Sequence, residues 1–170
     1  VVLIDNFIIS IPIGSIISED LTLTNTNGET ITANSIEIET GVEVSIESGT
    51  YEIEEIDVDG DLVVSSNGKV SINTLIIEED GSTVIESGTV YIDYVEVNDI
   101  ADSSILSGNV TIGELVVVNA SSNDTFVIEG GFVSIAESNV SITNSSGELS
   151  PRSSPGLLDC LLYTSDAADE

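Results

Sequence analysis

Ser87-Gly88-Thr89-Val90-Tyr91-Ile92 is a phrase that recurs with small changes along this chain. Related phrases occupy residues 48–53, 67–72, 107–112 and 130–135. Their glycines stand at positions 49, 68, 88, 108 and 131, so successive copies lie 19, 20, 20 and 23 residues apart. A phrase that repeats at a nearly constant spacing indicates a solenoid, in which each repeat forms one coil of the chain.

Each repeat carries apolar residues at alternate positions. The fourth residue after each glycine is isoleucine, and the second is Tyr51, Val70, Val90, Val110 or Val133. After a two-residue corner a second apolar pair follows: Ile56 and Val58, Leu75 and Ile77, Val95 and Val97, or Leu115 and Val117. Three residues before each glycine stands Ile46, Ser65, Ile85, Ile105 or Ile128. Period-two alternation is typical of strands with one buried face, so the pattern predicts three short strands in each repeat.

These features predict an all-β fold, a right-handed parallel β-solenoid whose coils, or rungs, contain about 20 residues. We expect a single domain over residues 1–150, with about six coils and the clearest repeats between residues 28 and 142. Neighbouring coils of such a fold lie about 4.8 Å apart. An antiparallel β-sandwich also has short strands at regular intervals, but it has no reason to repeat one phrase.

The composition excludes several classes of function. The chain has 31 acidic residues, 2 basic residues and no histidine, which gives a net charge of −29. Because such a surface repels a polyanion, we expect no nucleic-acid partner. Catalytic triads and metal sites that need histidine are also excluded, and we expect no enzymatic activity. The 41% of hydrophobic residues nevertheless favours a folded chain over a disordered acidic one.

The two ends of the sequence give separate expectations. The chain begins at Val1 without a signal-peptide pattern, and we expect it to be a fragment of a longer protein. Residues 1–18 are apolar but interrupted by Asp5, Pro12 and Gly14, so no membrane insertion is expected. Residues 151–159 are expected to form a disordered linker or a junction.

Two resemblances extend this picture. The Ser-Gly-Thr-Val-x-Ile repeats resemble the β-helical coils of filamentous-haemagglutinin-like adhesins, autotransporter passengers and polymorphic outer-membrane proteins. This resemblance implies a secreted rod at the cell surface, which serves as the stalk or passenger of a surface adhesin and presents loops to a host or cell-surface ligand, either glycan or protein. The alternative is a fragment of a polysaccharide-active β-helix whose catalytic residues lie elsewhere. Residues 160–170 resemble a translated sequencing adapter and are expected to be non-native.

The sharpest candidate for a cofactor site is an acidic turn. Asp57, Asp59 and Asp61 alternate along the sequence beside Gly60, and oxygen ligands of this kind suit Ca²⁺. An EF-hand-like loop that began at Glu55 would need a bidentate acid at the position of Ser66, so an acidic turn without metal is the competing interpretation. A glycosidase carboxylate pair at Asp57 and Asp59 would lack a neighbouring cation other than Lys69.

Glycosylation sequons and two expected loops are further candidate sites on the outer surface of the solenoid. N-glycosylation sequons begin at Asn109, Asn119, Asn123, Asn139 and Asn144. Residues 98–104 and 119–125 are expected to form loops that project from the solenoid and carry any binding epitope, because insertions in a solenoid bulge from one face.

Overall fold

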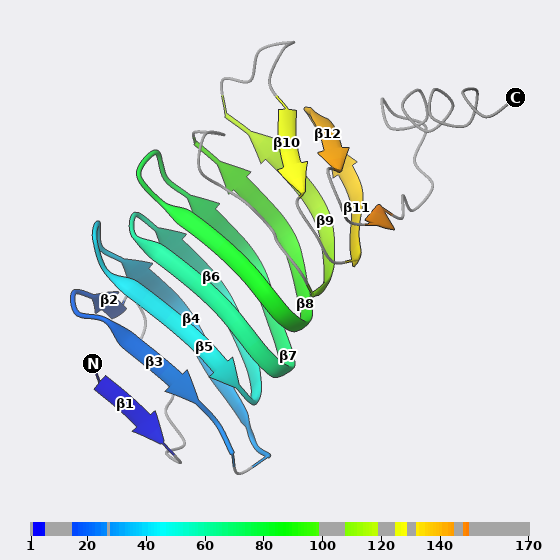
Figure 1. Cartoon of the computed structure of the whole chain (residues 1–170). Coiled ribbons are helices and arrows are strands. Elements are labelled where there is room, and N and C mark those ends of the chain that lie inside the picture. Colours follow the sequence, from blue (N-terminus) through cyan, green and yellow to red (C-terminus); the bar gives the residue numbers. More distant parts are fainter. Residues whose placement is uncertain are drawn as a thin grey trace, which may run out of the picture.

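A computed structural model describes residues 2–5, 15–26, 28–98, 108–118, 125–128, 132–144 and 148–149. These residues contain strands and turns but no helix (Figure 1). The first strands are β1 (Val2–Asp5), β2 (Ser15–Ile17), β3 (Leu21–Thr24), β4 (Thr30–Ile38), β5 (Glu43–Ser48) and β6 (Thr50–Val58). They are followed by β7 (Asp61–Ile77), β8 (Ser82–Val97), β9 (Asn109–Val117), β10 (Thr125–Ile128), β11 (Phe132–Ser138), β12 (Ser141–Asn144) and β13 (Glu148–Leu149).

The strands stack as a parallel β-solenoid of about five turns, with a spacing of about 20 residues. β6 pairs with β7, β7 with β8, β8 with β9 and β9 with β11, always in parallel. In Figure 1 the nearer strands run to the lower right and the more distant ones return to the upper left, while the chain advances toward the upper right. This is the sense of a right-handed coil, as predicted.

The interior consists of columns of apolar side chains that run along the coil axis. Successive coils place the residues of one column directly over one another, because Tyr51 pairs with Val70, Val70 with Val90, Val90 with Val110 and Val110 with Val133. All five side chains are at most 1% exposed. The pairs that follow the two-residue corner are at most 4% exposed, so the predicted inward positions of these two segments are confirmed.

The segment that follows the glycine and the segment that follows the two-residue corner are joined into one strand in each coil. β7 contains 17 residues and β8 contains 16, and both continue through the corner. At this corner the pairing of β6 with β7 passes from Ile53 to Glu55 and omits only Glu54. A bend that removes a single residue from the pairing of two coils leaves the hydrogen bonds on both sides of the bend intact. The three predicted segments of a coil therefore form two strands, as in β5 and β6, or a single strand, as in β7.

The segment before the glycine differs from the prediction in one coil. Ile46 pairs with Val64, and Val64 pairs with Ile85, so the interior column contains Val64 instead of the predicted Ser65. The register between β7 and β8 shifts after Val64 and again before Lys69. This coil therefore has one more residue between its buried column and its glycine than its neighbours, and the shift absorbs that residue.

Three of the repeat glycines have a backbone conformation with positive φ. The φ angles of Gly49, Gly88 and Gly108 are 109°, 88° and 110°. Residues that have a Cβ atom rarely adopt this backbone conformation. Beside Gly49, the Tyr51 hydroxyl donates a hydrogen bond of 2.7 Å to the Ser48 carbonyl oxygen. Burial raises the pKa of Tyr51 to about 12, so this inward-facing hydroxyl keeps its proton across the ordinary pH range.

Candidate functional site

The acidic turn lies between the end of β6 and the start of β7. Asp57 stands on β6, where it pairs with Glu37 of the preceding coil and Ile76 of the following one. The turn is held to the preceding coil because the backbone amides of Asp59 and Gly60 donate hydrogen bonds of 2.9 and 3.1 Å to the Ile38 carbonyl. The position of the turn is thus fixed by the stack.

Asp57 is the most perturbed carboxylate of this turn. Its Oδ1 atom is buried and has no hydrogen-bond partner. Burial raises the pKa of Asp57, and the negative charges of Glu78, Asp59, Glu37 and Glu55 raise it further. Folding therefore destabilises the ionised form of this side chain.

Asp61 is engaged by the next coil. One of its carboxylate oxygens accepts a hydrogen bond from the Ser82 hydroxyl, and the two residues are paired between β7 and β8. Within the ranges that the structure describes, no group of three or more acidic, cysteine or histidine side chains is arranged to hold a metal ion. Asp57, Asp59 and Asp61 alternate in sequence, but they do not form such a group.

Gly60 has a packing role in the same turn. A Cβ atom at this position would overlap the carbonyl oxygens of Val42 and Glu39, which belong to the turn of the preceding coil. Gly81 occupies the corresponding place one coil later, where a Cβ would overlap the Val58 carbonyl oxygen. The stacking of turns therefore explains the glycine of the Asp59-Gly60-Asp61 motif without reference to a metal ion.

The predicted glycosylation residues have different environments. Asn109 is exposed at the start of β9. The Asn139 side chain is hydrogen-bonded to the backbone of Val117, because its Nδ2 donates to the Val117 carbonyl and its Oδ1 accepts from the Val117 amide, each at 2.9 Å. Asn144 ends β12, and Asn119 and Asn123 lie outside the described residues.

The two predicted epitope loops lie mostly outside the described residues, as do residues 151–170. At the start of the first loop, the Asn98 side chain donates a hydrogen bond of 2.7 Å to Glu78 Oε2, one coil earlier. Thr125, the last residue of the second predicted loop, begins β10. The hydrogen bond to Glu78 anchors Asn98 to the preceding coil.

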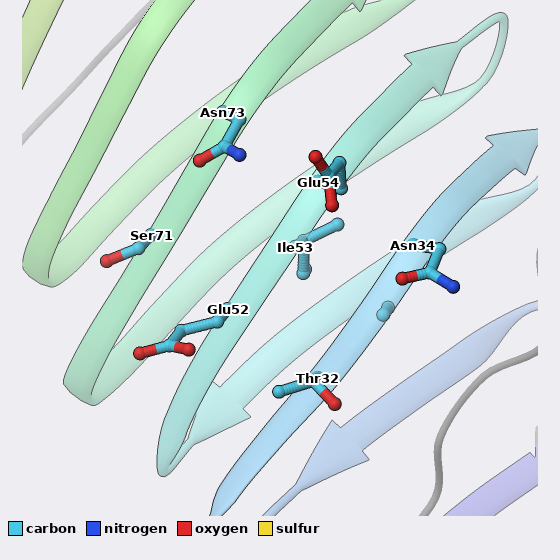
Figure 2. A pocket seen from close by; sticks show the side chains of 8 residues that line it. Thr32, Asn34, Glu52, Ile53, Glu54, Ser71 and Asn73 are labelled. Atoms are coloured by element: carbon cyan, nitrogen blue, oxygen red, sulfur yellow. The ribbon is translucent and has the colours of Figure 1, made fainter.

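A groove that the sequence did not indicate lies across β4, β6 and β7 (Figure 2). Its volume is about 390 Å³. Figure 2 shows two parallel rows of polar side chains that cross the three strands. The first row is Thr32, Glu52 and Ser71, and the second is Asn34, Glu54 and Asn73. Ala33 and Ile53 lie between the rows.

The groove offers hydroxyl, amide and carboxylate groups from three coils. In Figure 2 the carboxylates of Glu52 and Glu54 point in different directions, not toward each other. Such a groove can form hydrogen bonds to a polar ligand. Because the lining residues are about 20 positions apart in sequence, only the pairing register of the coils could have revealed the two rows.

No protein-family model, curated protein or solved structure matches this chain. The part of the chain described by the structure contains no helix that is long and apolar enough to cross a membrane.

Proposed function

We propose that this chain is a non-catalytic structural segment of a larger extracellular protein, a stalk or passenger that holds other parts of that protein away from the cell surface. The observation that carries this proposal is the column formed by Tyr51, Val70, Val90, Val110 and Val133, which continues through five coils without a change of register. A fold that repeats one contact gains length with each repeat and needs no new core.

The repeat pattern and the charge support the same function. The Ser-Gly-Thr-Val-x-Ile repeats resemble those of filamentous-haemagglutinin-like adhesins, autotransporter passengers and polymorphic outer-membrane proteins, which favours a location at the cell surface. A net charge of −29 favours a rod that remains soluble and separated from its neighbours. Its partner would be a host or cell-surface glycan or protein, and no cofactor is part of this proposal.

Changing the number of coils tests the structural part of the proposal. Lys69 pairs with Thr89 in the next coil, so residues 69–88 form one complete repeat that can be duplicated without a change of register. Three added copies should preserve the circular dichroism spectrum and lengthen the particle by about 14 Å, at about 4.8 Å per coil, in small-angle X-ray scattering. Duplication of residues 69–78 alone is the control, because it disrupts the register and should destabilise the stack.

A surface-display experiment tests the presentational part. The chain is placed between a membrane anchor and a terminal epitope, and antibody access to the epitope is measured with zero, one and three added coils. Access should increase with the number of coils. Access that is independent of this number would contradict a role as a stalk, even if all the proteins fold.

The groove favours a second candidate, a polysaccharide-active β-helix whose catalytic residues lie in another part of the protein. Glu52 and Glu54 stand beside hydroxyl and amide groups that suit a carbohydrate. In the longer protein that contains this chain, release of reducing ends from a polysaccharide would support this candidate if Glu52→Gln or Glu54→Gln raises the KM for that polysaccharide and leaves kcat unchanged, as expected for a groove that only binds substrate. Glu114→Gln is the matched control, because Glu114 is an exposed glutamate of β9 that does not line the groove.

A separate proposal concerns residues 160–170, whose sequence resembles a translated sequencing adapter. Long-read sequencing of the source DNA across the codons for residues 150–170 tests it. A native reading frame that replaces this peptide would support the proposal, and recovery of the same peptide would refute it.

A further inference from the structure

One outward surface of the solenoid differs in charge from the rest of the molecule. It is formed by the outward residues of the segment that follows each glycine, in five neighbouring coils. We call this surface the neutral face: Thr30, Thr32, Thr50, Glu52, Lys69, Ser71, Thr89, Tyr91, Asn109 and Thr111. All ten residues are exposed or half-buried, and only Glu52 and Lys69 are charged. The formal charge of this face is therefore zero.

The adjoining surface, beyond the two-residue corner, provides the contrast. We call it the acidic face: Ser35, Glu37, Glu55, Asp57, Thr74, Ile76, Tyr94, Glu96, Glu114 and Val116. It contains five carboxylates and no cation. Because both faces are built from the same coils, the scarcity of acidic residues on the neutral face, where Glu52 is the single carboxylate, is a property of that surface and not of the strands that form it.

The neutral face offers regularly repeated hydrogen-bonding groups. Threonine, serine and asparagine hydroxyls and amides stand in two rows, and the parallel register spaces successive members of each row by about 4.8 Å. The groove continues this surface across the corner, where Asn34, Glu54 and Asn73 add polar groups. A ligand that follows the coil axis would therefore meet a similar set of donors and acceptors at each coil.

An aromatic ring completes the surface. Tyr91 is 42% exposed, although it stands in the middle of the sheet. The Lys69 ammonium nitrogen lies 5.1 Å from the centre of the Tyr91 ring, which is within the range of a cation–π contact. This contact restrains the ring, and an aromatic side chain that is restrained in this way provides a large apolar contact area at a low entropic cost.

We propose that the neutral face binds an uncharged polysaccharide that lies along the coil axis. An anionic polymer would be repelled by a chain of net charge −29, whereas a neutral one is not. Repeating hydroxyl groups on the ligand match repeating hydroxyl and amide groups on the protein, and a sugar ring packs on Tyr91. A second copy of the chain is less suited to this face, because it brings the same net negative charge. This inference rests on the proposed adhesive role and names its ligand class.

Affinity electrophoresis tests the inference on the full chain, expressed without N-glycosylation because Asn109 lies on the neutral face. The probes are dextran, laminarin, mannan and arabinoxylan, with polygalacturonate as the anionic comparison. At least one neutral polymer should retard the protein, and the affinity should change less than twofold when NaCl is raised from about 50 to 500 mM, because no ion pairs are formed. Binding to polygalacturonate alone would overturn the inference.

A matched pair of variants locates the binding surface. Tyr91→Ala removes the ring of the neutral face and should weaken binding at least tenfold. Tyr94→Ala removes a ring from the acidic face of the same strand, where the hydroxyl donates to Glu96, and should change the affinity less than twofold. Thr89→Glu, which places a charge beside Tyr91, should also weaken binding, while circular dichroism verifies that each variant is folded.

Three results would overturn the inference: no retardation by any neutral polymer, equal effects of Tyr91→Ala and Tyr94→Ala, or a dimer in sedimentation velocity that Tyr91→Ala abolishes. The first would exclude neutral polysaccharides as the ligand. The second would place the binding surface outside the neutral face, and the third would make the neutral face a contact between copies. None of them changes the dependence of particle length on the number of coils, so failure of this inference is distinguishable from failure of the proposed stalk function.

Discussion

The Asn139 side chain pairs with the backbone of Val117 as if it were another strand residue, with hydrogen bonds of 2.9 Å to both the amide and the carbonyl. Val117 is the last residue of β9, and Asn139 follows the end of β11 in the next coil. A side-chain amide has the same donor and acceptor as a peptide group, and it continues the ladder where the strands end.

Asn139→Ala should therefore destabilise the solenoid. Loss of two hydrogen bonds at about 0.5–1.5 kcal/mol each predicts a decrease of about 1–3 kcal/mol in the free energy of unfolding, measured by urea denaturation. Asn109→Ala is the control, because it removes an exposed asparagine of the same sequon type, and it should have almost no effect. Equal effects at the two positions would show that the pairing with Val117 contributes nothing.

Ile92→Ala tests the interior column. Ile92 is 1% exposed and pairs with Ile72 and Ile112 in the adjacent coils, so truncation should cost about 2–5 kcal/mol. Glu96→Ala, on the outward side of the same strand, removes one hydrogen bond from Tyr94 but also relieves repulsion between carboxylates, and it should change stability by less than about 1 kcal/mol. Thermal unfolding of the two variants compares these costs.

Gly60→Ala tests the stacking of the turns. The added Cβ would overlap the carbonyl oxygens of Val42 and Glu39, so the two turns must separate and the free energy of unfolding should fall by more than about 2 kcal/mol. At Gly41, which has a φ of 78°, a Cβ would meet nothing within 4 Å. Gly41→Ala should therefore cost only the backbone strain of about 1–2 kcal/mol, and urea denaturation should rank it as the milder change.

Thr83→Val should stabilise the protein. Thr83 is 2% exposed and occupies an inward position that pairs with Leu62, and its hydroxyl has no hydrogen-bond partner. Valine has nearly the same shape and lacks this unpaired buried group, so we expect a gain of about 1 kcal/mol in the free energy of unfolding. Thr89→Val, at a half-buried outward position, should give no such gain; a loss of stability at Thr83 would indicate a bound water at its hydroxyl.

The pKa of Asp57 predicts a specific pH dependence. Because its pKa is raised in the folded state, the folded protein holds this proton at a pH where the unfolded chain has released it. The contribution of Asp57 to stability therefore falls as the pH rises through and above 3.8, the ordinary pKa of an aspartate. Asp57→Asn should raise the unfolding temperature at pH 7, and this difference should disappear below about pH 3.

Glu54→Gln is the control for this prediction, because it removes one negative charge from an exposed corner position. General relief of repulsion would stabilise both variants. A gain for Asp57→Asn that is no larger than the gain for Glu54→Gln would contradict a special role for the buried oxygen.

The sequence allowed the fold to be predicted in detail because the inward positions are strictly periodic. Val70, Val90 and Val110 are all fully buried, as their alternation requires. Ser65 was placed in the core wrongly, because counting back from a glycine assumes that every coil has the same number of residues. The register shift after Val64 depends on how two neighbouring coils accommodate an extra residue, and this cannot be inferred from one repeat.

The properties of the surface were less accessible to sequence reasoning. Asp57 stands between the buried residues Ile56 and Val58, a position that alternation assigns to the outer surface, yet one of its oxygens is buried. The groove and the neutral face arise from residues about 20 positions apart, and the neutral face is defined mainly by the acids it lacks. A motif search detects residues that are present, and therefore could not identify it.

The position of Lys69 gives the protein a built-in reporter of its own unfolding. Trypsin cuts only after lysine or arginine, and the chain has two such residues, Lys69 and Arg152. Lys69 lies within β7, where its amide donates to the Gly49 carbonyl and its neighbours pair with the adjoining coils. A protease needs an extended, unpaired segment, so cleavage after Lys69 requires the central coils to separate. The rate at which trypsin cuts after Lys69 therefore measures how often the middle of the rod opens.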